Sequence, residues 1–350
     1  MIRILSGDLL MADIIVPLED NPLLVPFIEE YRLVPGGKMA LADAGLQAFM
    51  DAIEGHAVHV VPGGSSANML TTLCRLLRGQ VQARFLGVAG QGPYSGLIAG
   101  SLAEAGVTLA PQDSSGRAAV SFVIVFPSGQ CTIATHPGNA RELLTAEMIT
   151  PEMMQESDIV LAQGSLWHKL DGAFPDRLVQ LAKIFGRALW LTLPTQTPLT
   201  QEAAAHFKEM LPQADLVFGN EAELLRLFPG TMEAAMAALQ QYLAGATGFI
   251  TLGKEGAVIV TAHTTEHVPP EGIDAGDIVN TLGAGDTSYA GFAAGFLKGL
   301  SAPDSAHIAM ALAAEKLRIN QPRLPDPMKS LCVAVPELAV KLGLLPLMEN

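Results

Sequence analysis

The amino-acid sequence predicts an α/β fold in which helices cover both faces of a mostly parallel sheet, with a small β-sheet forming a lid. From residue 150 onward, short apolar runs alternate with helical stretches, a pattern typical of parallel strands buried on both faces. Earlier in the chain, two β runs at 118–126 and 130–135 flank the turn Pro127-Ser128-Gly129, which indicates a hairpin. Two glycine-rich turns each lead into a predicted helix.

The first half of the chain mixes short strands with helices. Residues 20–32 are predicted to be helical, with Asp20 or Asn21 as N-cap and Pro22 in the first turn. Three further helices are predicted at 42–54, 66–77 and 95–105, and strands at 1–5, 58–61 and 83–88, with another apolar stretch at 14–17.

The second half shows the regular alternation. Strands are predicted at 159–161, 188–193, 216–218, 248–252 and 258–260. The apolar run 277–280 is interpreted as a strand that leads into a glycine turn and a helix over 287–300, and a late helix is predicted at 307–317. Because no repeat or low-complexity linker interrupts the sequence, we expect one domain over 1–350, with the lid formed by inserted segments at about 14–62 and 112–137.

Composition excludes several classes of function. The chain has 350 residues, 49% of them hydrophobic, and a net charge of −14, which argues against non-specific nucleic-acid binding. Three dispersed cysteines indicate neither a disulfide framework nor a zinc site. No apolar run reaches the length of a membrane helix, and the N-terminus has no small-residue cleavage site after its apolar stretch. We therefore expect no membrane partner and a cytoplasmic location.

The segment 280–286, Asn-Thr-Leu-Gly-Ala-Gly-Asp, is the most informative stretch. A tight glycine turn at a helix N-terminus directs backbone N–H groups and the positive end of the helix dipole at one point, which favours an anion. Asp286 places a carboxylate beside that point. Such a pairing suggests phosphoryl transfer, with the turn stabilising the transferred group and Asp286 deprotonating an alcohol. The alternative is an ordinary turn between elements.

A second glycine turn lies far upstream, at residues 62–68. Gly63 and Gly64 allow the backbone to approach a ligand closely, and Asn68 offers a donor and an acceptor, which suits a vicinal diol. Asp13 follows the first strand, where acidic residues commonly accept hydrogen bonds from ligand hydroxyls. The alternatives are a solvated turn residue for Asp13 and a helix cap for Asn68.

Two more elements bear on a nucleotide. Asn220 and Glu223 have the spacing of a capping box; the alternative is that they organise a hydrated Mg²⁺. The turn Thr251-Leu-Gly253-Lys-Glu-Gly256 could contact a nucleotide or form a plain hairpin.

Taken in this order, the motifs resemble the ribokinase-like, or PfkB, carbohydrate kinases along nearly the whole chain. The early segment 26–43 and Gln321-Pro322-Arg323 are most similar to the adenosine-kinase-like branch. The resemblance implies a three-layer α/β/α fold with a β lid. It also implies an ATP-dependent kinase that phosphorylates the hydroxymethyl group of a sugar or nucleoside.

The resemblance also implies a role for each motif. Asp286 would be the general base, with an anion hole from Gly283, Ala284 and Gly285. The acceptor would be bound by Asp13, Gly63, Gly64 and Asn68. The nucleotide would be contacted by Thr251, Gly253 and Gly256. The phosphates and Mg²⁺ would be held by Asn220 and Glu223, with Glu223 binding the ion through water. The adenine would lie near 309–314. ATP and Mg²⁺ are the implied cofactors, and the resemblance leaves a K⁺ requirement open.

Two departures from the family pattern bear on catalysis. Asn280 stands where Asp is usual, and Cys131 where adenosine-kinase-like members often have Arg; Lys254 or Arg141 could take over a contact to phosphate. These departures motivate an alternative function, a catalytically silent protein that binds a sugar or nucleotide.

The acceptor and the oligomeric state stay open. A nucleoside would need an apolar slab such as Phe122, Phe126 or Tyr31, and a sugar phosphate would need a basic residue such as Arg117. A monomer and a homodimer are both compatible with the sequence.

Overall fold

The larger of two sheets runs through the centre of the main body. The computed structural model describes residues 1–55, 58–110, 115–127, 130–169, 172–195 and 199–344. Within them this sheet has nine strands. Their order is β14 (Thr265–Val268), β13 (Ala257–Val260), β12 (Thr247–Thr251), β11 (Leu216–Asn220), β10 (Ala188–Thr192), β9 (Ile159–Ala162), β1 (Ile2–Gly7), β5 (Val81–Leu86) and β6 (Val107–Ala110).

Parallel pairing extends from β6 to β12, and only β13 and β14 run antiparallel to their neighbours. The central strands are short and apolar because helices bury both of their faces; β9 is buried at every residue. This arrangement confirms the predicted α/β fold with a mostly parallel sheet.

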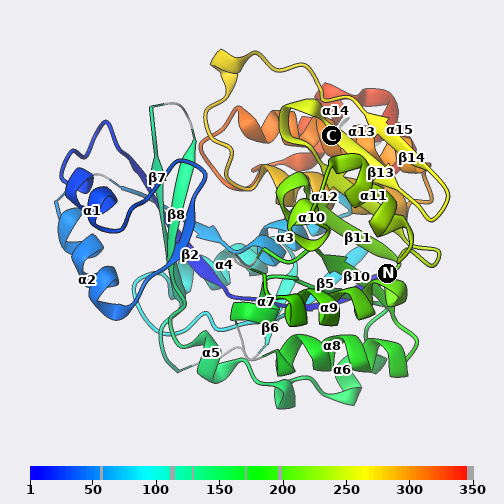
Figure 1. The fold of residues 1–350 in the computed structure, drawn as a ribbon, viewed down its shortest axis with the longest axis horizontal. Coiled ribbons are helices and arrows are strands. Elements are labelled where there is room, and N and C mark those ends of the chain that lie inside the picture. The colour runs from blue at the N-terminus through cyan, green and yellow to red at the C-terminus, as the bar shows by residue number, and fades with distance from the viewer. Residues whose placement is uncertain (56–57, 111–114, 128–129, 170–171, 196–198, 345–350) are drawn as a thin grey trace.

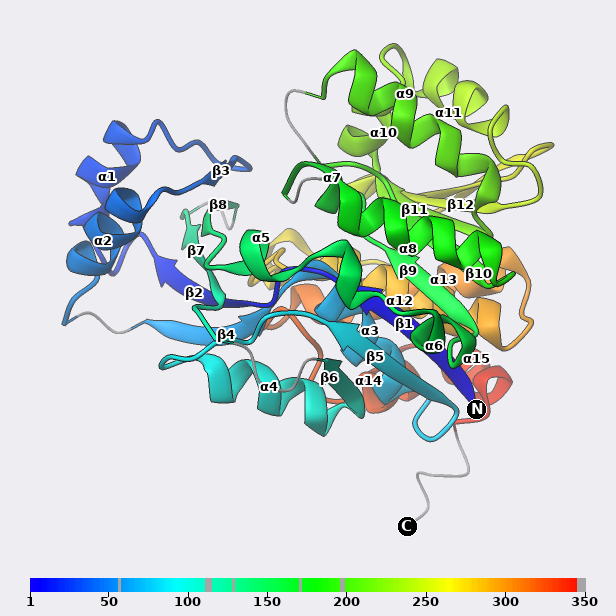
Figure 2. The ribbon, with the colours of Figure 1, turned by 90° about the horizontal axis from the view of Figure 1, so that it is seen from below.

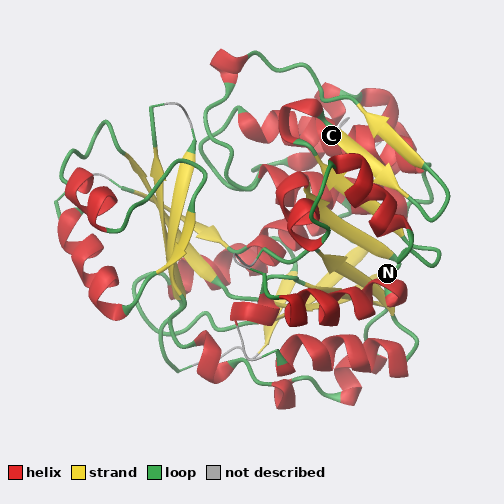
Figure 3. Cartoon of the chain, viewed as in Figure 1, coloured by secondary structure: helices red, strands yellow, loops and turns green. Residues whose placement is uncertain are grey.

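Helices form a layer on each face (Figures 1 and 3). One layer contains α3 (Ser65–Leu76), α4 (Ser95–Glu104), α12 (Ala284–Leu297), α13 (Ala302–Leu317), α14 (Pro327–Ala334) and α15 (Pro336–Leu342). The other contains α6 (Pro151–Gln155), α7 (Leu166–Lys169), α8 (Ala173–Ile184), α9 (Gln201–Met210), α10 (Glu221–Leu227) and α11 (Met232–Gln240). Shorter helical segments are α5 (Ala140–Leu143), η1 (Ala146–Met148), η2 (Leu211–Gln213), η3 (Gly253–Glu255) and η4 (Ala275–Asp277).

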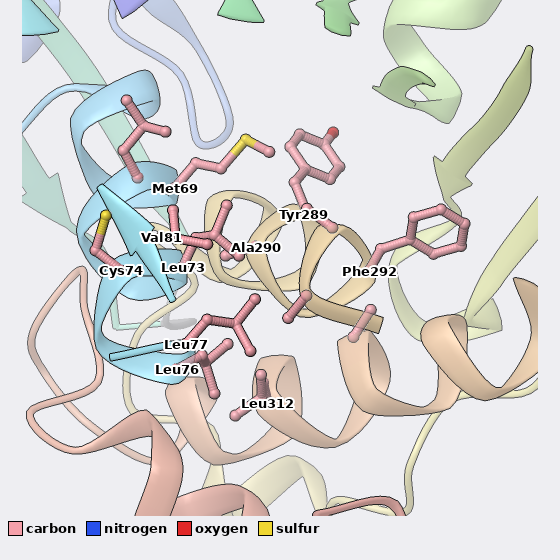
Figure 4. Packing of buried hydrophobic residues seen from close by; sticks show 14 of the residues in the cluster. Met69, Leu73, Cys74, Leu76, Leu77, Val81, Tyr289, Ala290, Phe292 and Leu312 are labelled. Carbon is pink, nitrogen blue, oxygen red and sulfur yellow. The ribbon is translucent and has the colours of Figure 1, made fainter. Parts of the chain in front are cut away.

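Helix α12 packs between α3 and α13. Ala290 faces the side chains of α3, whereas Phe292 points away from α3 and stacks on Phe249 of β12 (Figure 4). Small residues permit this close contact: a Cβ at Gly291 would lie 2.9 Å from the backbone of Ala309. The tight packing holds the N-terminus of α12 in a fixed place relative to α3.

The smaller sheet lies beside the main body (Figure 2). Its strands are, in order, β3 (Lys38–Ala40), β8 (Cys131–His136), β7 (Ala119–Val125), β2 (Met11–Pro17) and β4 (His59–Gly63). Helices α1 (Leu24–Glu30) and α2 (Asp43–Ala52) cover one face, where Phe49 packs on Phe122. The sheet extends past the predicted segment 14–62 at both ends, since β2 begins at Met11 and β4 ends at Gly63.

Several predicted elements differ from the structure. Helix α1 begins at Leu24 and not near residue 20, because Asn21 lies in a turn and donates from its side chain to Ala52 O. Strands β3, β6 and β14 were not predicted; they are short segments at sheet edges, where few residues carry the periodic signal. The turn 128–129 of the predicted hairpin lies outside the described residues, but β7 and β8 pair antiparallel as expected.

Candidate active site

The N-terminus of α12 is set by a glycine that no other residue could easily replace. Gly283 caps the helix in the left-handed region at φ 77°, and a Cβ there would collide with Pro322 O. The helix begins at Ala284, earlier than predicted, so Asp286 is its third residue.

The segment before this cap is not a strand, which corrects the prediction for 277–280. The N–H groups of Val279 and Asn280 donate to Leu317 O at 2.8 and 3.4 Å. The loop therefore pairs with the end of α13 and not with a neighbouring strand.

The first turn of α12 has the geometry of an anion site. A Cβ at Gly285 would have only the hydroxyl of Tyr289 near it, at 4.0 Å, so the helix entrance has room for a phosphoryl group. Helix termini leave N–H donors without intrahelical partners, and the dipole adds partial positive charge. The Ala284 N–H is turned toward Thr281 O, at 3.3 Å, which makes it a weaker candidate donor than the sequence suggested.

Asp13 lies inside β2 and is 4% exposed, so it is not a solvated turn residue. Its carboxylate packs on the Cα of Gly63, where any side chain would collide with it. Burial raises the pKa of Asp13 to about 7; the charge of Arg323 lowers it and that of Asp286 raises it further. Among the described residues no hydrogen bond reaches this carboxylate, so it is suited to accept hydrogen bonds from a ligand.

Asn68 connects the two glycine turns. It is the fourth residue of α3, which is capped by Gly64 at φ 101°, so Asn68 is not itself a helix cap. Its Oδ1 accepts from Arg323 Nε at 2.6 Å, and its Nδ2 donates to Asp286 Oδ2 at 2.8 Å. Both ends of the amide are thus engaged, and a ligand hydroxyl would have to replace or share one of these bonds.

Arg323 is a site residue to which the sequence gave no role of its own. It is 6% exposed, and besides Asn68 it donates to Ser101 Oγ at 3.2 Å and to Gly63 O at 3.5 Å. Burial lowers its pKa to about 10, and the charge of Asp13 acts against that shift. Its position in the short segment Gln321-Pro322-Arg323 was the only sequence signal.

The candidate nucleotide residues lie at the ends of β11 and β12. Asn220 and Glu223 form a reciprocal capping box at the start of α10, with bonds of 2.9 and 3.1 Å. Thr251, Gly253 and Gly256 belong to the turn between antiparallel strands β12 and β13.

Tyr289 connects this side of the site with Asp286. Burial raises its pKa well above the usual value and the charges of Glu223 and Asp286 raise it further, whereas Thr251 lowers it. The structure therefore places Glu223 and Thr251 near the entrance of α12.

Asn280 and Cys131, the two departures that bear on catalysis, contact each other. Cys131 Sγ lies 3.8 Å from Asn280 Oδ1. Among the three candidate cations, Arg117 pairs with Asp43 at 3.2 Å and Lys254 is almost fully exposed. The side chain of Arg141 lies outside the described part of the chain.

The face of the smaller sheet that carries Asp13 is largely apolar. Ile15, Val61 and Val123 form a cluster there, and Leu282 of the α12 loop packs on it. Phe122 and Tyr31 belong instead to the cluster under α1 and α2, so they are not positioned to stack on a ligand.

Clusters of metal ligands and membrane-spanning helices are both absent from the described residues. In the ranges that the structure covers, no group of three or more His, Cys, Asp or Glu could enclose a metal ion. None of the described helices is both long and apolar enough to span a bilayer.

Comparison with known proteins agrees with these features. Residues 39–327 match the model of the pfkB family carbohydrate kinases. The chain is 26% identical over 274 residues to a ribokinase from Lactococcus lactis, covering 77% of this chain and 83% of that protein.

Solved structures show the same fold. A probable sugar kinase from Rhizobium etli superposes with a TM-score of 0.81 at 21% identity, covering 96% of this chain and 98% of that one. An adenosine kinase from Sinorhizobium meliloti gives a TM-score of 0.81 at 22% identity, with 96% and 99% coverage.

Proposed function

The chain belongs to the pfkB family of carbohydrate kinases, and on that basis we propose that it transfers the γ-phosphoryl group of ATP to a primary alcohol of a sugar or nucleoside. The observation that supports this most directly is the hydrogen bond from Asn68 to Asp286. It joins the acceptor side of the site to a carboxylate at a helix entrance with room for a phosphoryl group.

Each residue has a defined part in the transfer. Asp13 would accept hydrogen bonds from the hydroxyls of the phosphoryl acceptor, and Asn68 would donate to them or accept from them. These bonds would direct the hydroxymethyl group of the acceptor toward Asp286. Asp286 would take the alcohol proton, which can leave late because the transition state is loose. The N–H groups at the entrance of α12, including that of Gly285, would stabilise charge on the transferred phosphoryl oxygens.

Glu223 and Asn220 are suited to a hydrated Mg²⁺, since this ion keeps several waters and needs few carboxylates. When bound, the ion would neutralise charge on the nucleotide phosphates. Thr251, Gly253 and Gly256 would contact the nucleotide from the turn after β12.

Ile15, Val61 and Val123 form an apolar face beside Asp13, which favours an acceptor with an uncharged part in contact with this face. Arg117 is paired with Asp43, so it is not poised for a phosphate on the acceptor. We propose an acceptor whose part distant from the reacting hydroxyl is uncharged.

The smaller sheet would act as a lid. It carries Asp13 and lies beside the main body that carries Asp286 (Figure 2), so closure would exclude water from the reaction. Small-angle scattering with and without ATP analogue and acceptor tests this: an unchanged profile would speak against closure.

The activity is tested by ADP production with Mg²⁺ and ATP across nucleosides, free sugars and sugar monophosphates. Asp286→Ala should lower turnover by about 10²–10⁴-fold, as loss of a general base does, while Asp277→Asn in the exposed loop before it should not. A turnover above about a tenth of wild type in Asp286→Ala would remove the role given to Asp286. Calorimetric ligand binding without transfer would favour the silent binding protein.

A further inference from the structure

Lys316 is a buried cation that the proposed reaction scheme does not use. It lies one residue from the end of α13 and is 0% exposed. Its Nζ donates to the main-chain carbonyl of Asn280 at 2.7 Å, and no described carboxylate forms an ion pair with it. Its neighbour Glu315 pairs instead with Arg318 at the surface. A buried ammonium held mainly by a neutral carbonyl is costly, so its presence calls for a role.

The carbonyl that Lys316 binds belongs to the loop that leads into the anion site. The same turn of α13 receives the N–H groups of Val279 and Asn280 at Leu317 O. Asn280 Oδ1 in turn accepts from the Leu282 N–H at 2.7 Å, one residue before the cap of α12. Lys316 and Leu317 thus hold Asn280 through its main chain, and Asn280 holds the loop up to Gly283.

The charge of Lys316 also acts on the site. Burial lowers its pKa to about 8, while the charges of Cys131 and Asp286 act against the shift. These two groups face it from β8 and α12, and Asn280 from the loop. Since Asn280 is uncharged, its contact does not neutralise the ammonium, and the coupling of Lys316 to Asp286 indicates that this charge acts at the entrance of α12.

We propose that Lys316 is a positioning residue for phosphoryl transfer, whose ammonium holds the Asn280–Gly283 loop and supplies beneath the anion site a positive charge that a bound monovalent cation would otherwise have to supply. The proposal rests on the proposed kinase function. It gives the departure at Asn280 a physical reason, because a carboxylate at that position would neutralise the lysine.

The test compares Lys316→Met, which keeps the side-chain length without the charge, with Lys298→Met, whose ammonium is exposed and bonds only Gln80 among the described residues. Lys316→Met should lower kcat at least about tenfold while the acceptor KM changes less than about threefold, because Asp13 and Asn68 are untouched. Lys298→Met should match wild type. A thermal melt verifies folding. A folded Lys316→Met with kcat within about twofold of wild type would overturn the proposal.

Two measurements separate charge from packing. Wild-type activity should change less than about threefold when Na⁺ replaces K⁺ at constant ionic strength, and a larger K⁺ dependence would overturn the proposal. In Lys316→Ala, methylammonium should restore activity several-fold, which a purely structural role would not allow; no rescue would count against the charge. The Na⁺/K⁺ comparison needs only wild type, so a strong K⁺ dependence would overturn the proposal even where the variants do not fold.

The two proposals fail in different ways. Wild type that phosphorylates no acceptor would sink the kinase function and this inference with it. Active wild type with an equally active Lys316→Met would sink this inference alone.

Discussion

Asn68 Nδ2 donates to Asp286 Oδ2 across 2.8 Å, so the residue proposed to bind the acceptor and the proposed base are hydrogen-bond partners. They come from the first turns of α3 and α12, which pack side by side. Arg323 holds the other end of the same amide. An acceptor hydroxyl that enters between the two residues therefore meets an oriented carboxylate.

Replacing Asn68 should separate its effects on stability and on catalysis. Asn68→Ala leaves the buried Arg323 short of one partner, so we expect a loss of about 1–3 kcal/mol in the free energy of unfolding. It also frees Asp286, so kcat/KM should fall about 10²-fold. Urea unfolding and steady-state kinetics measure the two effects.

Asn68→Asp is the matching variant. Its carboxylate can still accept from Arg323, so Arg323 keeps this partner. It also faces Asp286 with a like charge, so we expect both stability and activity to fall. Full activity in Asn68→Asp would show that the donated hydrogen bond is not needed.

The sequence predicted the sheet and the two glycine turns, but not how the motifs are connected. The alternation after residue 150 was readable because buried parallel strands are continuous apolar runs. Likewise, the glycine turns before α3 and α12 were readable because each needs a backbone that only glycine adopts easily, as Gly64 and Gly283 do.

Arg323 and Lys316 could not be assigned from the sequence because their roles depend on burial. A lysine at the end of a helix ordinarily complements the dipole at the surface; Lys316 is completely buried because α13 packs its last turn on the loop at Asn280. Similarly, Asp13 looked like a residue after a strand, and only the pairing of β2 with β4 places it on Gly63.

Glu223 can be tested as a magnesium residue without disturbing its cap. Glu223→Gln keeps a capping box, since Gln serves at that position, so the melting temperature should stay within about 2 °C of wild type. If Glu223 orders hydrated Mg²⁺, the Mg²⁺ concentration for half-maximal rate should rise at least about fivefold. The control is Glu221→Gln, an exposed residue in the same turn. An unchanged Mg²⁺ requirement would leave Glu223 only its capping role.

The ionised, buried carboxylate of Asp13 should lower the free energy of unfolding at neutral pH, although the same carboxylate is proposed to bind the acceptor. Its pKa is raised to about 7 from 3.8. A raised pKa means that the folded state holds the proton of Asp13 more tightly than the unfolded state does. The stability that this proton contributes is complete below pH 4 and is lost as pH rises through about 7. Asp13→Asn does not ionise, so at pH 8 it should be more stable than wild type by up to about 4 kcal/mol.

Unfolding of Asp13→Asn and wild type at pH 5 and pH 8 measures this difference, with exposed Asp20→Asn as control. The stability gain should be larger at pH 8, and acceptor binding should weaken. Equal gains at both pH values would mean that Asp13 does not titrate in this range.

Two glycine replacements with opposite expectations test whether Asp13 must lie against the backbone of β4. Gly63→Ala puts a methyl group into the space of the Asp13 carboxylate, which must then move by about the width of that group. Misplacement of about 1 Å in a positioned group can lower the rate about 10²-fold, so we expect kcat/KM to fall by that amount.

Gly96→Ala, the control variant, lies in α4 with nothing within 4 Å of its added methyl group. It should raise stability by about 0.4–1 kcal/mol, because alanine restricts the unfolded chain, and leave kinetics unchanged. Acceptor titrations and urea unfolding of both variants measure this. Wild-type kinetics in Gly63→Ala would show that Asp13 can bind the acceptor from another position, because the two variants add the same methyl group and differ only in what it meets.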